Sequence, residues 1–202
     1  MTAHLAAVVL AAGLSRRMGQ PKMTLPWGTT TVIGQVVKTL HEGGVTPVVV
    51  VTGGGRAAVE AALAQTAARC VFNPRHTDDS MLTSLQCGLA ALDEAVAAAL
   101  VVLGDQPQME GATLNALRAA YRGAQTPLIV PSFQMRRGHP WLLDRSLWGE
   151  AERAAAAALT LRQFLQAQQA AIHYVTVESA SVLQDLDTPE DYRQQTNSLA
   201  SP

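Results

Sequence analysis

The segment Leu5–Lys22, with the sequence LAAVVLAAGLSRRMGQPK, constrains the fold more than any other part of the chain. It begins as an aliphatic, β-prone run, ends at small residues and Gly13, and continues into a polar loop that carries two arginines and a lysine. A strand that ends in such a loop presents backbone N–H groups and cations to phosphate. The segment therefore predicts the first strand and the phosphate-binding loop of an α/β protein.

The spacing of residues in this loop excludes two common phosphate-binding motifs. A P-loop needs Gly, four residues and then Gly-Lys-Ser/Thr, but Gly19 is followed by Gln20 and Pro21. The dinucleotide motif Gly-x-Gly-x-x-Gly also fails, because Ser15 stands where the second glycine is required. The loop therefore indicates a different mode of phosphate binding.

Short aliphatic runs alternate with helical patterns along the rest of the chain. The runs typical of buried strands are Leu5–Leu10, Pro47–Val51, Leu100–Leu103, Leu128–Val130 and Ile172–Val177, with Cys70–Phe72 as a weaker candidate. The helical patterns are 31–42, Gly54–Ala67, Ser80–Leu92, Ala112–Tyr121 and Ser146–Gln169. This alternation predicts an α/β fold over residues 1–202, a single domain with a doubly wound (Rossmann-like), mostly parallel sheet. Roughly the last eight residues are expected to form a flexible tail.

Composition limits the classes of function. A chain of 202 residues with 48% hydrophobic residues can bury one sizeable core. The net charge of −1 gives no electrostatic case for nucleic acid or an anionic membrane. No run reaches the roughly 18 to 20 apolar residues of a membrane span, and two cysteines are too few for a disulfide framework. We therefore expect a soluble, cytoplasmic protein with neither nucleic acid nor membrane as partner.

Asp105 stands where a ligand-binding residue of such a sheet is expected. It follows the strand candidate Leu100–Leu103 through one glycine, Gly104. Ligands of doubly wound sheets bind beyond the carboxyl ends of the strands. A carboxylate there can hold Mg²⁺ together with phosphate oxygens and water, or it can cap the following turn through its own side chain. The residues alone leave both readings open.

A second acidic segment lies near the C-terminus. Asp185 and Asp187 are two residues apart, so in an extended segment they project to the same side. Thr188 and Pro189 then form a helix start, as an N-cap and a first helical residue. Two carboxylates on one side exceed what a helix cap needs.

Five motifs in order give the chain a family resemblance. They are LAAG with Arg17-Met18-Gly19 and Lys22, NPRHTDDSMLTSLQCGL (73–89), GDQP (104–107), RRGHP (136–140) and DLDTPEDY (185–192). Together they resemble the molybdenum cofactor nucleotidyltransferases, and among these the molybdopterin cytidylyltransferases. The resemblance implies a fold of the nucleotide-diphospho-sugar transferase type. It also implies Mg²⁺-dependent transfer of CMP from CTP to the phosphate of molybdopterin, with release of pyrophosphate.

The resemblance also assigns roles to the residues that match its motifs. It implies that Arg17, Lys22 and Asp105 are catalytic, and that Asp105 and Asp187, in preference to Asp185, bind the metal. The implied nucleotide-binding residues are Leu10, Ala11, Ala12, Gly13, Arg17, Lys22, Thr52, Ser84, Gly104 and Asp105. The implied acceptor-binding residues are Arg137, Gly138 and His139. As an isolated histidine before a proline, His139 equally fits a residue that packs within its loop, and Ser84 equally fits a small residue on an early helical turn.

Residue 12 carries the nucleobase prediction. Within this family LAAG is typical of cytidylyl enzymes and LAGG of guanylyl enzymes, and this chain has Ala12. A methyl group at that position takes space that a purine needs, so the resemblance implies CTP.

The chain departs from the family on the acceptor side. Only Arg162 remains of the family's Gly-Asp and Gly-x-Arg pattern, and Ser80 replaces a usual glycine. Two alternatives therefore stay open: an enzyme of the same fold with another phosphorylated acceptor such as a sugar phosphate, and a non-catalytic chaperone that binds or inserts the molybdenum cofactor. A target molybdoenzyme is a possible partner. Retention of Arg17, Lys22, Asp105 and Asp187 argues against the chaperone.

Overall fold

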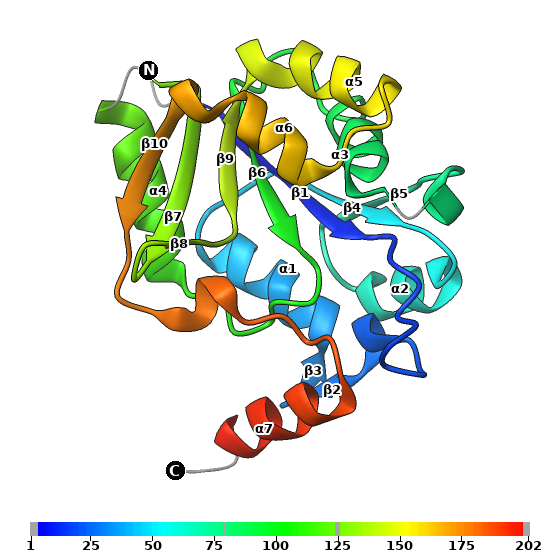
Figure 1. The fold of residues 1–202 in the computed structure, drawn as a ribbon. Helices are drawn as coiled ribbons and strands as arrows, with labels where there is room; N and C mark the ends of the chain where they lie inside the picture. Colours follow the sequence, from blue (N-terminus) through cyan, green and yellow to red (C-terminus); the bar gives the residue numbers. More distant parts are fainter. Residues whose placement is uncertain (1–3, 79, 124–125, 200–202) are drawn as a thin grey trace.

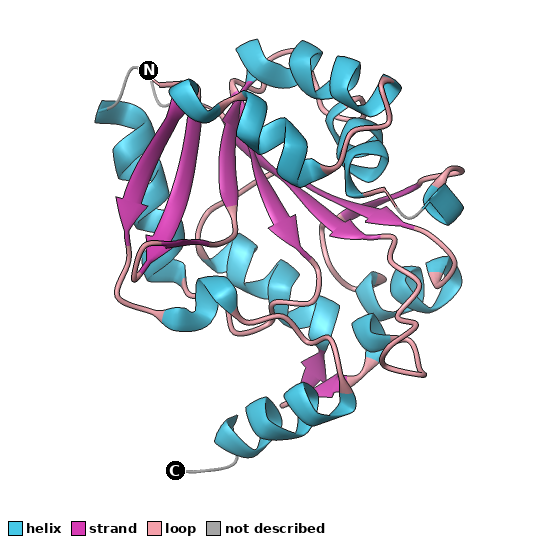
Figure 2. Cartoon of the chain, in the orientation of Figure 1, coloured by secondary structure: helices cyan, strands magenta, loops and turns pink. Residues whose placement is uncertain are grey.

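The chain forms one large sheet with helices on both faces (Figures 1 and 2). The computed structural model describes residues 4–78, 80–123 and 126–199. The strands of the large sheet are β1 (Leu5–Ala11), β4 (Val48–Thr52), β5 (Arg69–Phe72), β6 (Ala98–Leu103), β7 (Leu128–Phe133), β8 (Arg136–Arg137), β9 (Trp141–Asp144) and β10 (Ile172–Thr176). The helices are α1 (Val32–Glu42), α2 (Arg56–Leu63), α3 (Met81–Leu89), α4 (Gly111–Gly123), α5 (Trp148–Ala156), α6 (Leu161–Ala167) and α7 (Pro189–Leu199). A small hairpin, β2 (Pro26–Trp27) and β3 (Thr30–Thr31), stands apart.

The strand order is β10-β7-β9-β6-β1-β4-β5, with β8 added beside β7. All pairings along this order are parallel except those of β9, which runs antiparallel between β6 and β7. The central strands β1, β4 and β6 are buried along their whole length, which explains their nearly continuous aliphatic sequence. The predicted doubly wound, mostly parallel sheet is confirmed.

Two apolar clusters form the core, one on each face of the sheet. On one face α3, α5 and α6 cover the sheet, and on the other α1, α2 and α4 cover it (Figure 1). Alternate residues of β1 belong to different clusters: Val8 packs with Leu85 of α3, and Val9 packs with Val36 of α1. Because successive side chains of a strand point to opposite faces of the sheet, one aliphatic run contributes to both apolar clusters.

The structure corrects several boundaries. The single helix predicted over Ser146–Gln169 is wrong, because the chain breaks at Ala158, which has φ +54, and restarts at Thr160. Thr160 and Gln163 form a capping box, a strong helix start that follows the alanine run 154–158. The antiparallel strand β9 was not predicted. The predicted tail begins within α7, so residues 195–199 are helical, and residues 200–202 lie outside the described residues.

The topology places the candidate site between β1 and β6. The chain moves from β1 to β4 and β5 on one side and returns through α3 to β6 on the other. Leu10 pairs with Leu103, so the two loops that follow these strands leave the sheet side by side. This reversal of strand order is where doubly wound sheets bind their ligands. Within the described residues, no helix has the length and apolar character needed to cross a membrane.

Candidate active site

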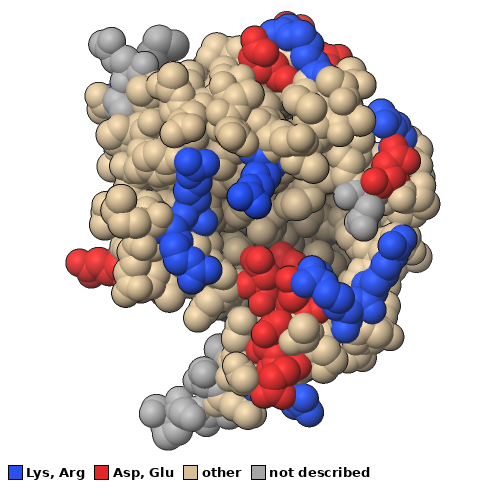
Figure 3. Space-filling view, in the orientation of Figure 1, with Lys and Arg blue, Asp and Glu red and all other residues tan. Residues whose placement is uncertain are grey.

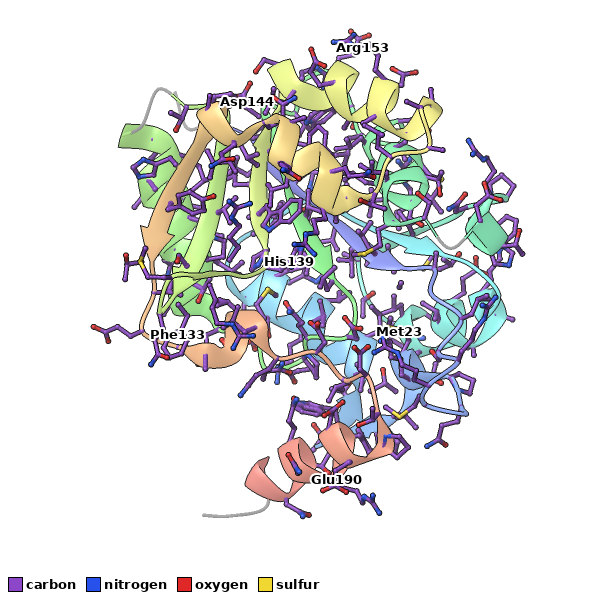
Figure 4. The ribbon with its side chains drawn as sticks, in the orientation of Figure 1. Met23, Phe133, His139, Asp144, Arg153 and Glu190 are labelled. Carbon is purple, nitrogen blue, oxygen red and sulfur yellow. The ribbon has the colours of Figure 1, made fainter. Side chains whose placement is uncertain are left out.

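A cavity of about 470 Å³ opens at the carboxyl ends of β1 and β6. Its lining includes many of the predicted site residues: Leu10, Ala12, Gly13, Arg17, Lys22, Ser84, Asp105 and Asp187. On the face shown in Figure 3, acidic side chains gather at the lower rim of a hollow, with basic side chains next to them and across from them. In Figure 4, Met23 and His139 lie on different sides of the carboxyl end of β6.

Lys22 sits between two carboxylates from distant parts of the chain. Its ammonium forms an ion pair with Asp105 and lies 3.4 Å from Oδ1 of Asp187. Arg17 approaches the same carboxylate, with its Nη1 atom 2.9 Å from Oδ2 of Asp187. The Lys22 side chain is 11% exposed and the Arg17 side chain 72%. Lys22 is therefore a partly buried ion-pair partner, and Arg17 is a solvated one.

The conformation of the loop explains why the exposed side chain of Arg17 lies at the cavity. Ser15 adopts a positive φ of 49°, and its carbonyl accepts a hydrogen bond from the N–H of Met18 (3.1 Å). The hydroxyl of Ser15 also accepts from the N–H of Lys22 at 3.3 Å. Met18 is buried in a small cluster with Trp27 and other apolar residues. This buried methionine anchors the loop and leaves Arg17 free to face the cavity.

Three hydrogen bonds and one buried side chain hold the backbone of Asp187 at the end of β6. Leu186 is fully buried in the same small cluster as Met18, and its N–H donates to the carbonyl of Asp105 at 3.1 Å. The carboxylate of Asp191 accepts hydrogen bonds from the N–H groups of Asp187 (3.2 Å) and Thr188 (2.8 Å) at the start of α7. The predicted helix start therefore also fixes the backbone of Asp187.

Asp185 has a different environment from Asp187. It lines the cavity but accepts a 2.7 Å hydrogen bond from the amide of Gln106, and no ion pair joins it to Lys22 or Arg17. Burial raises the pKa of Asp185, and the negative charges of Asp105 and Asp187 raise it further. Arg17 and Lys22 therefore pair with Asp187 and not with Asp185. Asp187 is also the residue that the resemblance prefers as a metal ligand.

The donor set fits a small, hard cation. Within the described parts of the chain, no group of three or more His, Cys, Asp or Glu side chains has the arrangement of a metal site. Mg²⁺ does not need one, because it usually takes one or two carboxylates and completes its shell with water and phosphate oxygens. Asp105 and Asp187, which already share one cation in Lys22, supply two such carboxylates.

The predicted acceptor residues lie outside the lining of this cavity. The N–H of Gly138 donates to the carbonyl of Pro131, and its own carbonyl accepts from the indole of Trp141 at 2.8 Å. The His139 ring stacks on Trp141 with 4.5 Å between centroids, and its Nε2 atom is buried without a hydrogen-bond partner among the described residues. Burial lowers the pKa of His139 to about 4, so its ring is neutral near pH 7. Arg137 is exposed, with its guanidinium 5.5 Å from the ring centroid of Tyr174.

Three predicted nucleotide-binding residues also lie outside the lining of this cavity. Thr52 is fully buried and its hydroxyl donates to the carbonyl of Val71 in β5 at 3.4 Å, so the structure does not bring it to the cavity. Ala11 and Gly104 are absent from the lining as well. A Cβ on Gly104 would lie 3.0 Å from the carbonyl oxygen of Leu10, so this glycine lets the two loops approach closely.

The structure adds residues to the cavity that no motif role or spacing had singled out. Ser15, Met23, His76, Ser80 and Met81 also line it, as does Asp185, which the spacing of the C-terminal acidic segment had already singled out. Several of them belong to the motif 73–89, whose position in the family pattern was the available signal. Asn73 of this motif is almost fully buried and donates from its amide to the hydroxyl of Ser84 at 3.1 Å. Ser84 is therefore held by a buried partner at the edge of the cavity.

Comparison with known proteins agrees with the fold and defines the class of protein as a nucleotidyltransferase. Residues 7–172 match the model of the MobA-like NTP transferase domain. The chain therefore belongs to the MobA-like NTP transferase family.

Three similar proteins and structures match nearly the whole chain. The molybdenum cofactor cytidylyltransferase of Escherichia coli is 28% identical over 187 residues, which are 92% of each protein. The crystal structure of Rv0371c from Mycobacterium tuberculosis superposes with a TM-score of 0.81 at 29% identity, covering 98% of this chain and 100% of that one. A structure of Rv0371c in complex with manganese gives a TM-score of 0.80 at 28% identity, covering 96% and 99%.

A more distant neighbour confirms the fold type alone. The 4-diphosphocytidyl-2C-methyl-D-erythritol synthase of Anaerococcus prevotii has a TM-score of 0.82 at 15% identity, covering 99% of this chain and 97% of that one. The predicted fold of the nucleotide-diphospho-sugar transferase type is thus confirmed.

Proposed function

We propose that this protein transfers CMP from CTP to the phosphate of molybdopterin in a Mg²⁺-dependent reaction that releases pyrophosphate. The observation that carries the proposal is the placement of Lys22 and Arg17 against the carboxylates of Asp105 and Asp187 in one cavity. The similarity to a molybdenum cofactor cytidylyltransferase over 92% of the chain supports the choice of substrates. Cys70 and Cys87 are both free, which is compatible with a cytoplasmic location.

In the proposed reaction, a phosphate oxygen of the acceptor attacks the α-phosphorus of CTP in line, and pyrophosphate leaves. The protein forms no covalent intermediate; it positions the reactants and stabilises the charge that develops. Arg17, Lys22 and the backbone of Ala12 and Gly13 hold the triphosphate as pyrophosphate departs. Asp105 and Asp187 hold Mg²⁺, which neutralises phosphate charge when it is bound.

Lys22 has two roles in this proposal. Its ammonium balances the charges of Asp105 and Asp187. Asp105 and Asp187 would hold the metal ion with these same carboxylates, and the Lys22 ammonium would then be available to bind the anionic triphosphate. Its position at the start of a short 3-10 turn, Lys22–Thr24, keeps its backbone in place while the flexible side chain changes partner.

We assign the nucleobase preference to Ala12. This residue is 6% exposed and lines the cavity, so its methyl group occupies space next to the ligand. One methyl group of steric selection is worth about 1–3 kcal/mol. The wild-type protein therefore prefers CTP over GTP, and Ala12→Gly partly relaxes this preference.

The acceptor is the second point at which candidates differ. Arg137, Gly138 and His139 do not line the cavity, and this observation favours a second candidate: a nucleotidyltransferase for another phosphorylated acceptor such as a sugar phosphate. A chaperone that only carries the molybdenum cofactor to a target molybdoenzyme does not need the pairing of Lys22 with Asp105. We therefore place the enzyme ahead of the chaperone, and a molybdoenzyme stays a proposed partner for the product.

Pyrophosphate release by the purified protein tests these alternatives. CTP or GTP is supplied with Mg²⁺ and either molybdopterin or a sugar phosphate, and Asp105→Asn serves as the inactive control. Release with CTP and molybdopterin is the expected result. Release with the sugar phosphate alone moves the function to the second candidate, and no release with any pair leaves the chaperone. Equal use of CTP and GTP contradicts the role of Ala12.

A further inference from the structure

The loop after β6 is joined to the segment before α7 by hydrogen bonds between residues far apart in the sequence. The amide of Gln106 donates to Oδ1 of Asp185 at 2.7 Å, across 79 positions of sequence. The N–H of Leu186 donates to the carbonyl of Asp105 at 3.1 Å. The amide of Gln108 donates to the carbonyl of Gln184. Among these bonds, only that of Gln106 with Asp185 joins two side chains.

This bond is protected from water on one side. Gln106 is 2% exposed, and Asp185 is half-buried at the edge of the cavity. A buried amide that loses its partner keeps the cost of desolvation without the compensating hydrogen bond. Substitution of either partner should therefore destabilise the contact between the loop after β6 and the segment before α7.

The position of the bond connects it to the proposed metal site. Gln106 follows Asp105 directly, and Asp185 precedes Asp187 by two residues. Leu186, between the two acidic residues, is fully buried and fixes the direction of the backbone. The spacing of two then puts both acidic side chains on the cavity side, where both are found. The bond thus ties the chain next to one proposed metal ligand to the chain next to the other.

We propose that Gln106 and Asp185 are a positioning pair for the two carboxylates of the proposed metal site. The amide of Gln106 holds Asp185 against the end of β6, and this contact makes Asp187 converge on Asp105. Asp185 acts through the hydrogen bond that its Oδ1 atom accepts, and its negative charge is not required. The inference rests on the proposed function, in which Asp105 and Asp187 bind a divalent cation.

Four variants of the full chain separate the hydrogen bond from the charge. Asp185→Asn keeps an oxygen acceptor for Gln106 and removes the charge, whereas Asp185→Ala and Gln106→Met remove the bond. The fourth variant combines Gln106→Met with Asp185→Ala. Mn²⁺ binding, measured by the electron paramagnetic resonance signal of the free ion with and without CTP, is the readout, together with thermal unfolding.

For a positioning pair, Asp185→Asn keeps Mn²⁺ affinity within about threefold of the wild type. Each variant that removes the bond weakens Mn²⁺ binding about tenfold, which corresponds to the loss of one hydrogen bond to a charged group. The double variant is no weaker than either single one, because both substitutions remove the same interaction. In the pyrophosphate assay, the concentration of Mg²⁺ needed for half-maximal rate rises for the same variants.

Other results overturn the proposal. If Asp185→Asn weakens Mn²⁺ binding as much as Asp187→Asn does, Asp185 is a direct ligand. If Gln106→Met lowers the unfolding temperature and leaves Mn²⁺ affinity unchanged, the bond is only structural. A wild-type protein that binds no Mn²⁺ in either condition refutes the pair and the metal site together. Failure of the proposed function has a different result: normal Mn²⁺ binding and variant effects, but no pyrophosphate release from CTP.

Discussion

Replacing Lys22 with methionine tests whether its ammonium and a metal ion compete for the same carboxylates. Lys22→Met keeps the length and the aliphatic part of a side chain that is 11% exposed, and it removes the charge shared by Asp105 and Asp187. We expect the free variant to bind Mn²⁺ more tightly than the wild-type protein and to lose turnover. An exposed loop lysine outside the site would give neither effect.

The distance between Lys22 and Asp187 sets the size of the expected gain in Mn²⁺ affinity. At 3.4 Å, the separation of Lys22 Nζ and Asp187 Oδ1, Coulomb's law with an effective dielectric constant of about 20 gives roughly 5 kcal/mol. Asp187 is 31% exposed, so hydration of its carboxylate offsets much of this Coulomb energy when the lysine is lost. We expect about 1.4 to 2.8 kcal/mol to remain, which is a tenfold to hundredfold gain in Mn²⁺ affinity. Turnover falls on the order of 10²-fold or more, because a cation on the departing pyrophosphate is lost.

The assay is a Mn²⁺ titration of the nucleotide-free protein, followed by the rate of pyrophosphate release. Lys38→Met is the matched control, because Lys38 is an exposed lysine that pairs only with Glu42, at 3.9 Å, among the described residues. The control should bind Mn²⁺ like the wild type. Unchanged or weaker Mn²⁺ binding by Lys22→Met would falsify the shared use of the carboxylates, whatever happens to turnover.

Three further predictions concern other residues. Asp105→Asn should cut turnover on the order of 10²-fold or more with an unchanged fold by circular dichroism; near-normal rates and an unchanged Mg²⁺ titration would remove Asp105 from the site. Gly138→Ala would place a Cβ 2.4 Å from the carbonyl oxygen of Val182, so we expect about 1–3 kcal/mol of destabilisation and an unfolding temperature several degrees lower by calorimetry; an unchanged temperature contradicts this. The pKa of His139 is lowered to about 4 by burial, so between pH 6.5 and 4 the unfolded chain binds a proton that the folded chain does not, and stability falls as the pH drops through this window. The free energy of unfolding, measured with urea, should fall by about 1–2 kcal/mol from pH 7 to 5 through this group. In His139→Phe the fall over the same pH range should be smaller by that amount.

The sequence by itself determined the class of fold and the position of the first strand with the polar loop that follows it. Continuous aliphatic runs such as Leu5–Leu10 need burial on both sides, and only a sheet covered by helices on both faces provides it. The position of Asp105 after one such run places it at the carboxyl end of a strand. The helix start at Thr188 was readable because capping depends on a few adjacent residues.

Tertiary structure alone decided which distant residues meet. Lys22 and Asp187 are separated by 165 positions of sequence, and the order of the strands, rather than any local preference, brings them together. The same holds for Gln106 and Asp185, and for Thr52, whose hydroxyl bonds to β5 rather than facing the cavity. Local propensity describes what each segment prefers, but the pairing of β9 between β6 and β7 depends on the whole sheet. For that physical reason the placement of residues 137–139, outside the cavity, was the least predictable part of the candidate site, and the placement of the loop after β1, which lines the cavity, was the most predictable.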